Sequence, residues 1–191
     1  MKSKAICFAA VLVLVLAGNM GALAQDSKLE KFGSRIDFKG QINAYSPQTG
    51  TAGPYEIRGP WSLKLDRNTG KVEFSAAVNM ELSDGWALTV NKDSTTPFDP
   101  KARNAHTHHI TMSADQVTEL SGGGFQISGT ATVTLNGGPT PFAQQSPLTI
   151  AITGGTDVPF SNITLLFSGP AAGHFGSEVL PGVVRSVQAE R

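Results

Sequence analysis

The sequence predicts an all-β fold, a single antiparallel β-barrel or β-sandwich of about eight or nine strands with one short helix. Two observations support this. Apolar and polar residues alternate with a period of two over long stretches, and turn residues separate these stretches, with 21 Gly and 11 Pro in 191 residues. The alternation does not distinguish a barrel from a sandwich. The few charges at strand edges favour a barrel, because closure removes exposed edges.

The N-terminus has the pattern of a secretory signal. Lys2 and Lys4 precede an apolar run over residues 5–17, and Ala22-Leu23-Ala24 supplies the small residues that a signal peptidase accepts. An uncleaved anchor is the alternative, but the run is short for a bilayer. We therefore expect residues 1–24 to be a signal peptide, residues 25–191 to form one all-β domain, and the mature protein to be secreted or periplasmic.

Composition narrows the partners of the mature chain. Its only cysteine, Cys7, lies in the signal, so the domain is expected to fold without disulfides, although these are common in exported domains. Without Lys2 and Lys4, 13 of the 15 basic residues remain against 15 acidic ones, a net charge of −2. We expect no nucleic-acid partner and no electrostatic capture by anionic lipid, because the sequence has no basic stripe.

The first half of the domain contains one hairpin with especially regular alternation. Tyr55, Ile57, Trp61, Leu63 and Leu65 alternate with polar residues, the turn at residues 66–70 ends in a glycine, and the alternation returns from Val72. Other strands are expected before and after it, at residues 32–44, 86–90 and 104–112. Residues 91–103, with two prolines, are expected to form a long loop, a class that is often functional.

The second half begins with the only helical signal. Ser113-Ala114-Asp115-Gln116 has the form of a capping box, and Gly122-Gly123-Gly124 can end a helix of two turns at most. Three prolines, the last of them Pro147, are expected to keep the segment after residue 136 irregular. Residues 169–176 are expected to form a loop, and Pro181-Gly182 to break the last strand. The remaining expected strands are residues 125–135, 148–152, 163–167 and 179–187.

The richest chemistry lies in the strand at residues 104–112, which holds three of the four histidines. Ile110 and Met112 should face the core, and the same parity turns His106 and His108 inward and His109 outward. Two imidazoles two residues apart on one face can bind one ion such as zinc or copper. His174 is a candidate third ligand, which would leave a position for water. Hydrogen-bonded core histidines without a ligand are the alternative.

Other features carry less chemistry. Asp93, Asp99 and Asp115 are possible partners for an imidazole, or solvated loop carboxylates. Trp61 and Trp86 could line a pocket, although packing is the commoner role of a tryptophan on a strand. The sequence contains no nucleophile elbow, phosphate loop or dinucleotide fingerprint. Catalytic residues and an organic cofactor are therefore not assigned.

These patterns favour an exported binding protein that holds a metal ion or a small apolar ligand near His106 and His108. One alternative is a metal- or histidine-dependent hydrolase or isomerase, since histidine titrates near neutral pH. A second is a structural envelope protein without a ligand. A third is a small outer-membrane barrel, which two Trp and two Tyr make less attractive because such barrels carry aromatic girdles.

A short region resembles a known repeat. The segment at residues 61–74, followed by His106-Thr107-His108, is similar to the strand–turn–strand and histidine segment of chordin-type repeats. The rest of the chain departs from the order and spacing of that family. The resemblance implies no catalytic residues.

Overall fold

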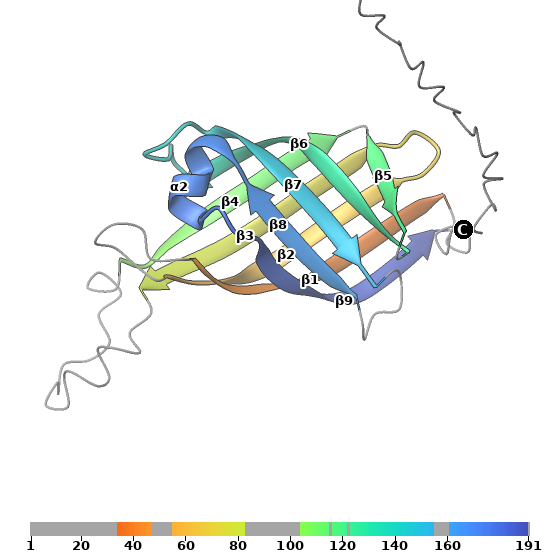
Figure 1. The fold of residues 1–191 in the computed structure, drawn as a ribbon, viewed down its shortest axis with the longest axis horizontal. Coiled ribbons are helices and arrows are strands. Elements are labelled where there is room, and N and C mark those ends of the chain that lie inside the picture. The colour runs from red at the N-terminus through yellow and green to blue at the C-terminus, as the bar shows by residue number, and fades with distance from the viewer. Residues whose placement is uncertain are drawn as a thin grey trace, which may run out of the picture.

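In the computed structural model, the strands close into an antiparallel β-barrel (Figure 1). Eight strands form the ring, and one extra strand, β5, lies beside β6. The structure describes residues 34–46, 55–82, 104–114, 116–121, 123–154 and 161–190. The strands are β1 (Arg35–Ser46), β2 (Tyr55–Asp66), β3 (Val72–Leu82), β4 (His106–Ala114), β5 (Val117–Leu120), β6 (Gly124–Leu135), β7 (Gln145–Thr153), β8 (Asn162–Phe167) and β9 (Leu180–Glu190). A 3₁₀ turn, η3 (Gly169–Ala171), and a short helix, α2 (Ala172–Phe175), connect β8 to β9.

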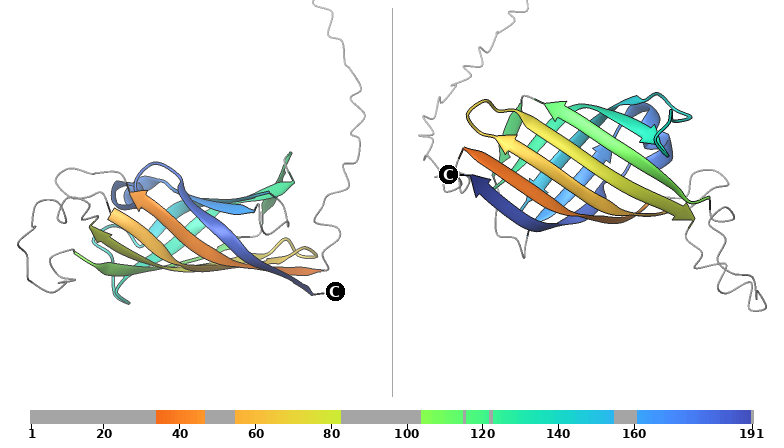
Figure 2. Two further views of the ribbon diagram at one scale, coloured as in Figure 1. Left: turned by 90° about the horizontal axis from the view of Figure 1, so that it is seen from below. Right: turned by 180° about the vertical axis from the view of Figure 1, so that it is seen from behind.

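One pairing decides between a barrel and a sandwich. The strands follow the order β4-β3-β2-β1-β9-β8-β7-β6-β5, and β4 also pairs with β6. The C-terminal residues of β6, Ala131 to Leu135, pair with β4, whereas its first residues pair with β5. The ring therefore closes through β4 and β6, as the two views in Figure 2 show. Closure leaves no strand of the ring with an unpaired edge along its whole length.

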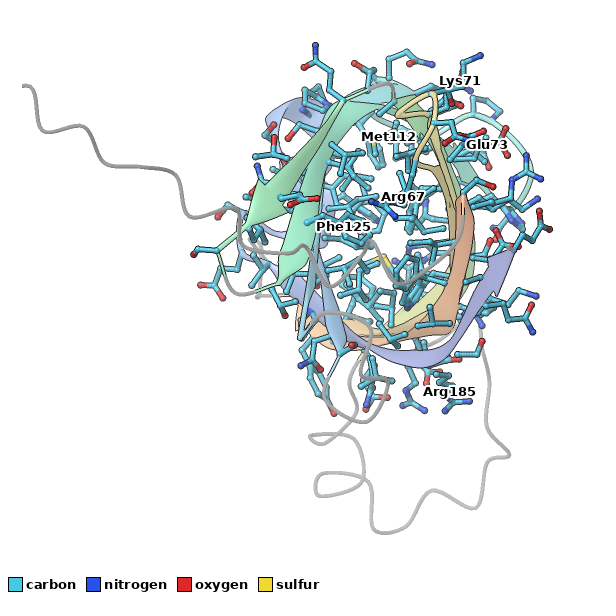
Figure 3. The ribbon with its side chains drawn as sticks, turned by 90° about the vertical axis from the view of Figure 1, so that its right-hand side faces the viewer. Arg67, Lys71, Glu73, Met112, Phe125 and Arg185 are labelled. Carbon is cyan, nitrogen blue, oxygen red and sulfur yellow. The ribbon has the colours of Figure 1, made fainter. Side chains whose placement is uncertain are left out.

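The inside of the ring is filled by apolar side chains. The predicted alternation is observed in every long strand, and residues such as Phe38, Ile127 and Leu165 are fully buried. Phe38 and Phe125 touch across the interior, with ring centroids 5.4 Å apart. Viewed from the end opposite α2, Phe125 and Met112 lie within the ring of strands (Figure 3). The barrel is thus held together by a packed core.

The predicted hairpin is confirmed. The Asp66 carboxylate accepts hydrogen bonds from the backbone N–H groups of Asn68 and Thr69, at 2.9 and 3.1 Å. The Thr69 bond is the main reason why the pKa of Asp66 lies below its usual value. Gly70 has a φ of 69°, a conformation that suits glycine. The turn therefore has the chemistry that its sequence predicts.

The prediction of a helix of at most two turns between the capping box at Ser113 and the glycine run is wrong. Ser113 and Ala114 belong to β4, and Val117–Leu120 form β5, which pairs with β6. Cross-strand hydrogen bonds override the capping pattern here, and β-branched residues such as Val117 suit a strand. Gly123, with a φ of 82°, donates its N–H to the Leu120 carbonyl at 2.9 Å, so this glycine lies in the turn between β5 and β6. The short helix lies instead at Ala172–Phe175, within the segment expected to be a loop.

Two prolines expected to interrupt strands lie inside them. Pro147 is the third residue of β7, and Pro181 the second residue of β9. Each proline has a ladder partner in only one of the two neighbouring strands. Pro147 pairs with β6 while the β8 ladder begins at Leu148, and Pro181 pairs with β8 while the β1 ladder begins at Gly182. A proline is tolerated at such a ladder end.

The expected strand at residues 86–90 and loop at residues 91–103 lie outside the described residues. In the described part of the chain, no helix has the length and apolar character needed to cross a membrane.

Candidate metal centre

The three histidines of β4 divide between the two faces of the strand as predicted. His108 is fully buried, His106 is half-buried and His109 is exposed. In the ladder with β3, His108 lies opposite Val78 and His106 opposite Met80, both of which are buried in the barrel. His106 and His108 therefore point inward near the start of β4.

The segment between β8 and β9 brings His174 to the same place. Phe175, the last residue of α2, is fully buried and stacks on Phe167 of β8, with ring centroids 4.4 Å apart and an interplanar angle of 14°. Gly176 ends the helix with a φ of 96°. This packing fixes α2 at the end of the barrel where β4 begins (Figure 1). His174 thus reaches two residues that lie 66 and 68 positions earlier in the sequence.

The ring nitrogens of the three histidines converge. His174 Nε2 lies 2.8 Å from His108 Nε2 and 3.2 Å from His106 Nε2. One nitrogen from each ring lies within 4.8 Å of those of the other two. Zinc–nitrogen bonds of 2.0–2.1 Å in a tetrahedral site require nitrogens roughly 3.3 Å apart. Small side-chain rotations would therefore bring the three rings to the spacing of one ion.

Backbone carbonyl groups fix the orientation of two of the rings. His106 Nδ1 lies 2.6 Å from the Asn104 carbonyl, and His108 Nδ1 lies 3.0 Å from the Thr134 carbonyl. Because a carbonyl only accepts, each Nδ1 carries the hydrogen, and the Nε2 of each neutral ring carries a lone pair. This arrangement, an imidazole that donates through one nitrogen and presents the other, is typical of metal-binding histidines.

The Nε2 lone pairs of His106 and His108 outnumber the hydrogens that His174 can donate to them. A neutral His174 has at most one hydrogen on Nε2, which it can donate well to one neighbour only. His108 is the nearer of the two, so the lone pair on His106 Nε2 faces the cluster without a full donor. A cation at the centre would be bound by all three nitrogens. The cluster therefore has the donor set of a metal site.

Asn104 supports this arrangement from the start of β4. Its φ of 50° is in the left-handed region, which asparagine tolerates better than most residues. In this conformation its carbonyl accepts from His106, while its side-chain Nδ2 donates to the Tyr55 hydroxyl at 2.9 Å. One residue thus orients a histidine and a neighbouring aromatic ring.

Aromatic rings surround the cluster. Phe175 lies edge-on to His108 at 5.0 Å, and Phe142 lies 5.3 Å from His174. Tyr55, on β2, lies 5.8 Å from His106. These rings limit the rotamers of the histidines and keep water away from part of the cluster.

Burial makes two of the histidines hard to protonate. Burial, with a smaller effect from the charge of a protonated His174, lowers the pKa of His108 from 6.5 to about 4. Burial also lowers the pKa of His174 to about 4, with a smaller effect from His106. Both rings are therefore neutral near pH 7, the form in which imidazole binds a metal.

We expect the metal-free protein to lose stability as the pH falls from about 6.5 to about 4. Within this window the unfolded chain binds protons that buried His108 and His174 do not, so acid favours unfolding. At 1.36 kcal/mol per unit of pKa, His108 contributes about 3 kcal/mol of this loss. His174 contributes less because it is partly exposed to solvent.

Urea unfolding of the chelator-treated protein at several pH values within this window measures the effect. A His108→Gln variant should have a shallower pH dependence than the natural chain. Equal slopes for the two proteins would contradict the expected role of His108. Asp66, whose pKa lies below 3.8, contributes only under more acidic conditions.

An open depression of about 410 Å³ reaches the edge of the site. His106, Thr107 and Asn79 line part of it. Glu56 and Glu81 also line it, and Arg58 pairs with both carboxylates. Two carboxylates and one guanidinium group therefore line this depression beside His106.

All three predicted ligand residues meet, but other predicted participants do not. The described residues include no carboxylate in this cluster. Asp93, Asp99, Asp115 and Trp86 lie outside the described residues, and Trp61 is buried against Gly40 in the core. Sequence reasoning did not identify the two carbonyl groups or the aromatic residues Tyr55, Phe142 and Phe175. The one signal in the sequence for these aromatic neighbours was the phenylalanine directly after His174.

Comparison with family models, curated proteins and solved structures finds no match to this chain. The resemblance to chordin-type repeats thus has no support from a family model. The function of this protein must therefore be inferred from the geometry of the site.

Proposed function

We propose that this protein binds a transition-metal ion through the Nε2 atoms of His106, His108 and His174. The observation that carries the proposal is the convergence of the Nε2 atoms of three imidazole rings. In two of these rings, the Nδ1 hydrogen is donated to a backbone carbonyl. These nitrogens have lone pairs that can bind a cation. Because the rings are largely neutral near pH 7, metal binding would release few protons. Zinc and copper both suit imidazole ligands.

Export is part of the same proposal. The signal pattern supports cleavage before Gln25, and a mature domain without cysteine would require no disulfide formation after export. The protein would then bind its ion in the periplasm or the medium. A small apolar ligand, the other expectation from the sequence, would have to compete with the side chains that fill the barrel.

Elemental mass spectrometry of the untagged mature protein tests the proposal. We expect about one zinc or copper ion per chain, either as purified or after the metal is added back to chelator-treated protein. The His106→Ala/His108→Ala double variant should bind none. The matched control is His109→Ala, which removes the exposed histidine of the same strand and should leave metal content unchanged.

Two results would overturn the proposal. One is the absence of bound metal in the natural chain even after zinc or copper is added back. The other is equal loss in the double variant and in His109→Ala, which would show that binding occurs outside the cluster. Intact mass of the exported protein reports cleavage before Gln25 independently of metal content.

A further inference from the structure

We infer that the preferred ion is copper(I) and that the thioether sulfur of Met80 is its fourth ligand. This inference rests on the proposed metal-binding function and identifies the ion and the ligand set of the same site. Two features support it: the charge of the histidine cluster and the residue that lies beside it on β3.

The histidine cluster contributes no negative charge. Its three ligands are neutral imidazoles, and no carboxylate of the described residues belongs to it. The charge of the ion is therefore also the charge of the centre. Phe142, Phe175 and Tyr55 pack against the cluster, in which His108 is fully buried and His106 and His174 are half-buried. Burying a divalent charge in apolar surroundings costs more than burying a monovalent one.

Met80 is the neighbour of His106 across the β3–β4 ladder. The two residues are directly paired, and Met80 is fully buried with its side chain on the inner face of the barrel. In an antiparallel pair, the Cβ atoms of such residues lie about 4.5–5.5 Å apart. Methionine is unbranched and has three rotatable side-chain bonds. A side chain of this length and flexibility, directly opposite His106, is suited to bring its sulfur to an ion bound there.

The chemistry of the thioether selects the ion. Thioether sulfur is a soft ligand that suits copper(I), whereas zinc takes thiolate, imidazole or carboxylate. Three imidazoles alone accept either metal. Together, a neutral ligand set, the aromatic rings packed against it and a thioether beside His106 favour monovalent copper over zinc.

A pair of methionine variants tests the inference. Met80→Leu changes the sulfur with little change in volume, and Met112→Leu makes the same change farther along the interior at a residue paired with Phe74. Copper(I) affinity is measured without oxygen by competition with bicinchoninate, and zinc affinity by competition with a chromophoric zinc chelator. Circular dichroism and thermal melts confirm that both variants fold.

We expect Met80→Leu to weaken copper(I) binding roughly tenfold and to change zinc binding less than about twofold. Met112→Leu should change neither. Copper X-ray absorption should detect a sulfur neighbour in the natural chain and in Met112→Leu, but not in Met80→Leu.

The outcomes separate this inference from the proposed function. If the natural chain binds zinc and copper(I) but Met80→Leu binds them as the natural chain does, the inference fails and the metal site stands. An equal loss of zinc and copper(I) affinity in Met80→Leu also overturns the inference, because it indicates a packing effect. If the natural chain binds neither metal, both fail.

Discussion

Replacement of His174 by alanine should lower metal affinity by about 100-fold or more while leaving the barrel folded. His174 supplies the nitrogen that lies within 3.2 Å of both other histidines, and it comes from a short connecting helix outside the ring of strands. Its loss removes one ligand and leaves two on the same strand. Competition with a chromophoric chelator measures the change.

The control for His174→Ala is His109→Ala, which also removes an imidazole but from the exposed face of β4. The control should bind metal as the natural chain does. Unchanged affinity in His174→Ala would show that His106 and His108 bind the ion without α2. A folded His174→Ala protein, checked by circular dichroism, is needed for either conclusion.

Replacement of Phe175 by alanine should destabilise the protein by about 3–5 kcal/mol. The ring is fully buried, stacks on Phe167 at 4.4 Å and contacts His108 edge-on at 5.0 Å. Its removal would leave a cavity under α2 and free His174 to move, so metal affinity should fall as well. Urea unfolding of the metal-free protein measures the stability change.

Leu166→Ala is the matched comparison for Phe175→Ala. Leu166 lies next to Phe167 on β8 but is 37% exposed, so its truncation should cost much less. If the two substitutions cost the same, Phe175 does not anchor α2. If Phe175→Ala destabilises the chain but binds metal normally, the ligand geometry of His174 does not depend on this ring.

Patterns within single strands were predictable from the sequence. The inward direction of His106 and His108 follows from the parity of Ile110 and Met112, because side chains in a strand alternate between two faces. The turn at Asp66 and Gly70 was predictable for a similar reason, because an aspartate and a glycine each favour a turn through their own local hydrogen bonds and backbone conformation. These features depend on neighbours a few positions away.

Features that depend on distant parts of the chain were not predictable. The choice between a barrel and a sandwich follows from the pairing of β4 with β6, which no local pattern encodes. The same pairing network places Ser113 and Ala114 in β4 and Val117–Leu120 in β5, where a helix was predicted. The approach of His174 to His108 depends on strand order and on the packing of Phe175, so the sequence could suggest the residue but not the contact.

An ion shared by β4 and α2 would act as a reversible cross-link. It would join residues 66 and 68 positions apart, in a chain whose single cysteine, Cys7, precedes the whole barrel. An unfolded chain must close a long loop to gather these ligands, which is entropically costly, so the ion would bind mainly to chains whose strands have already closed. Loading with metal would then report completed folding, and its stabilising effect would rise and fall with the free metal concentration.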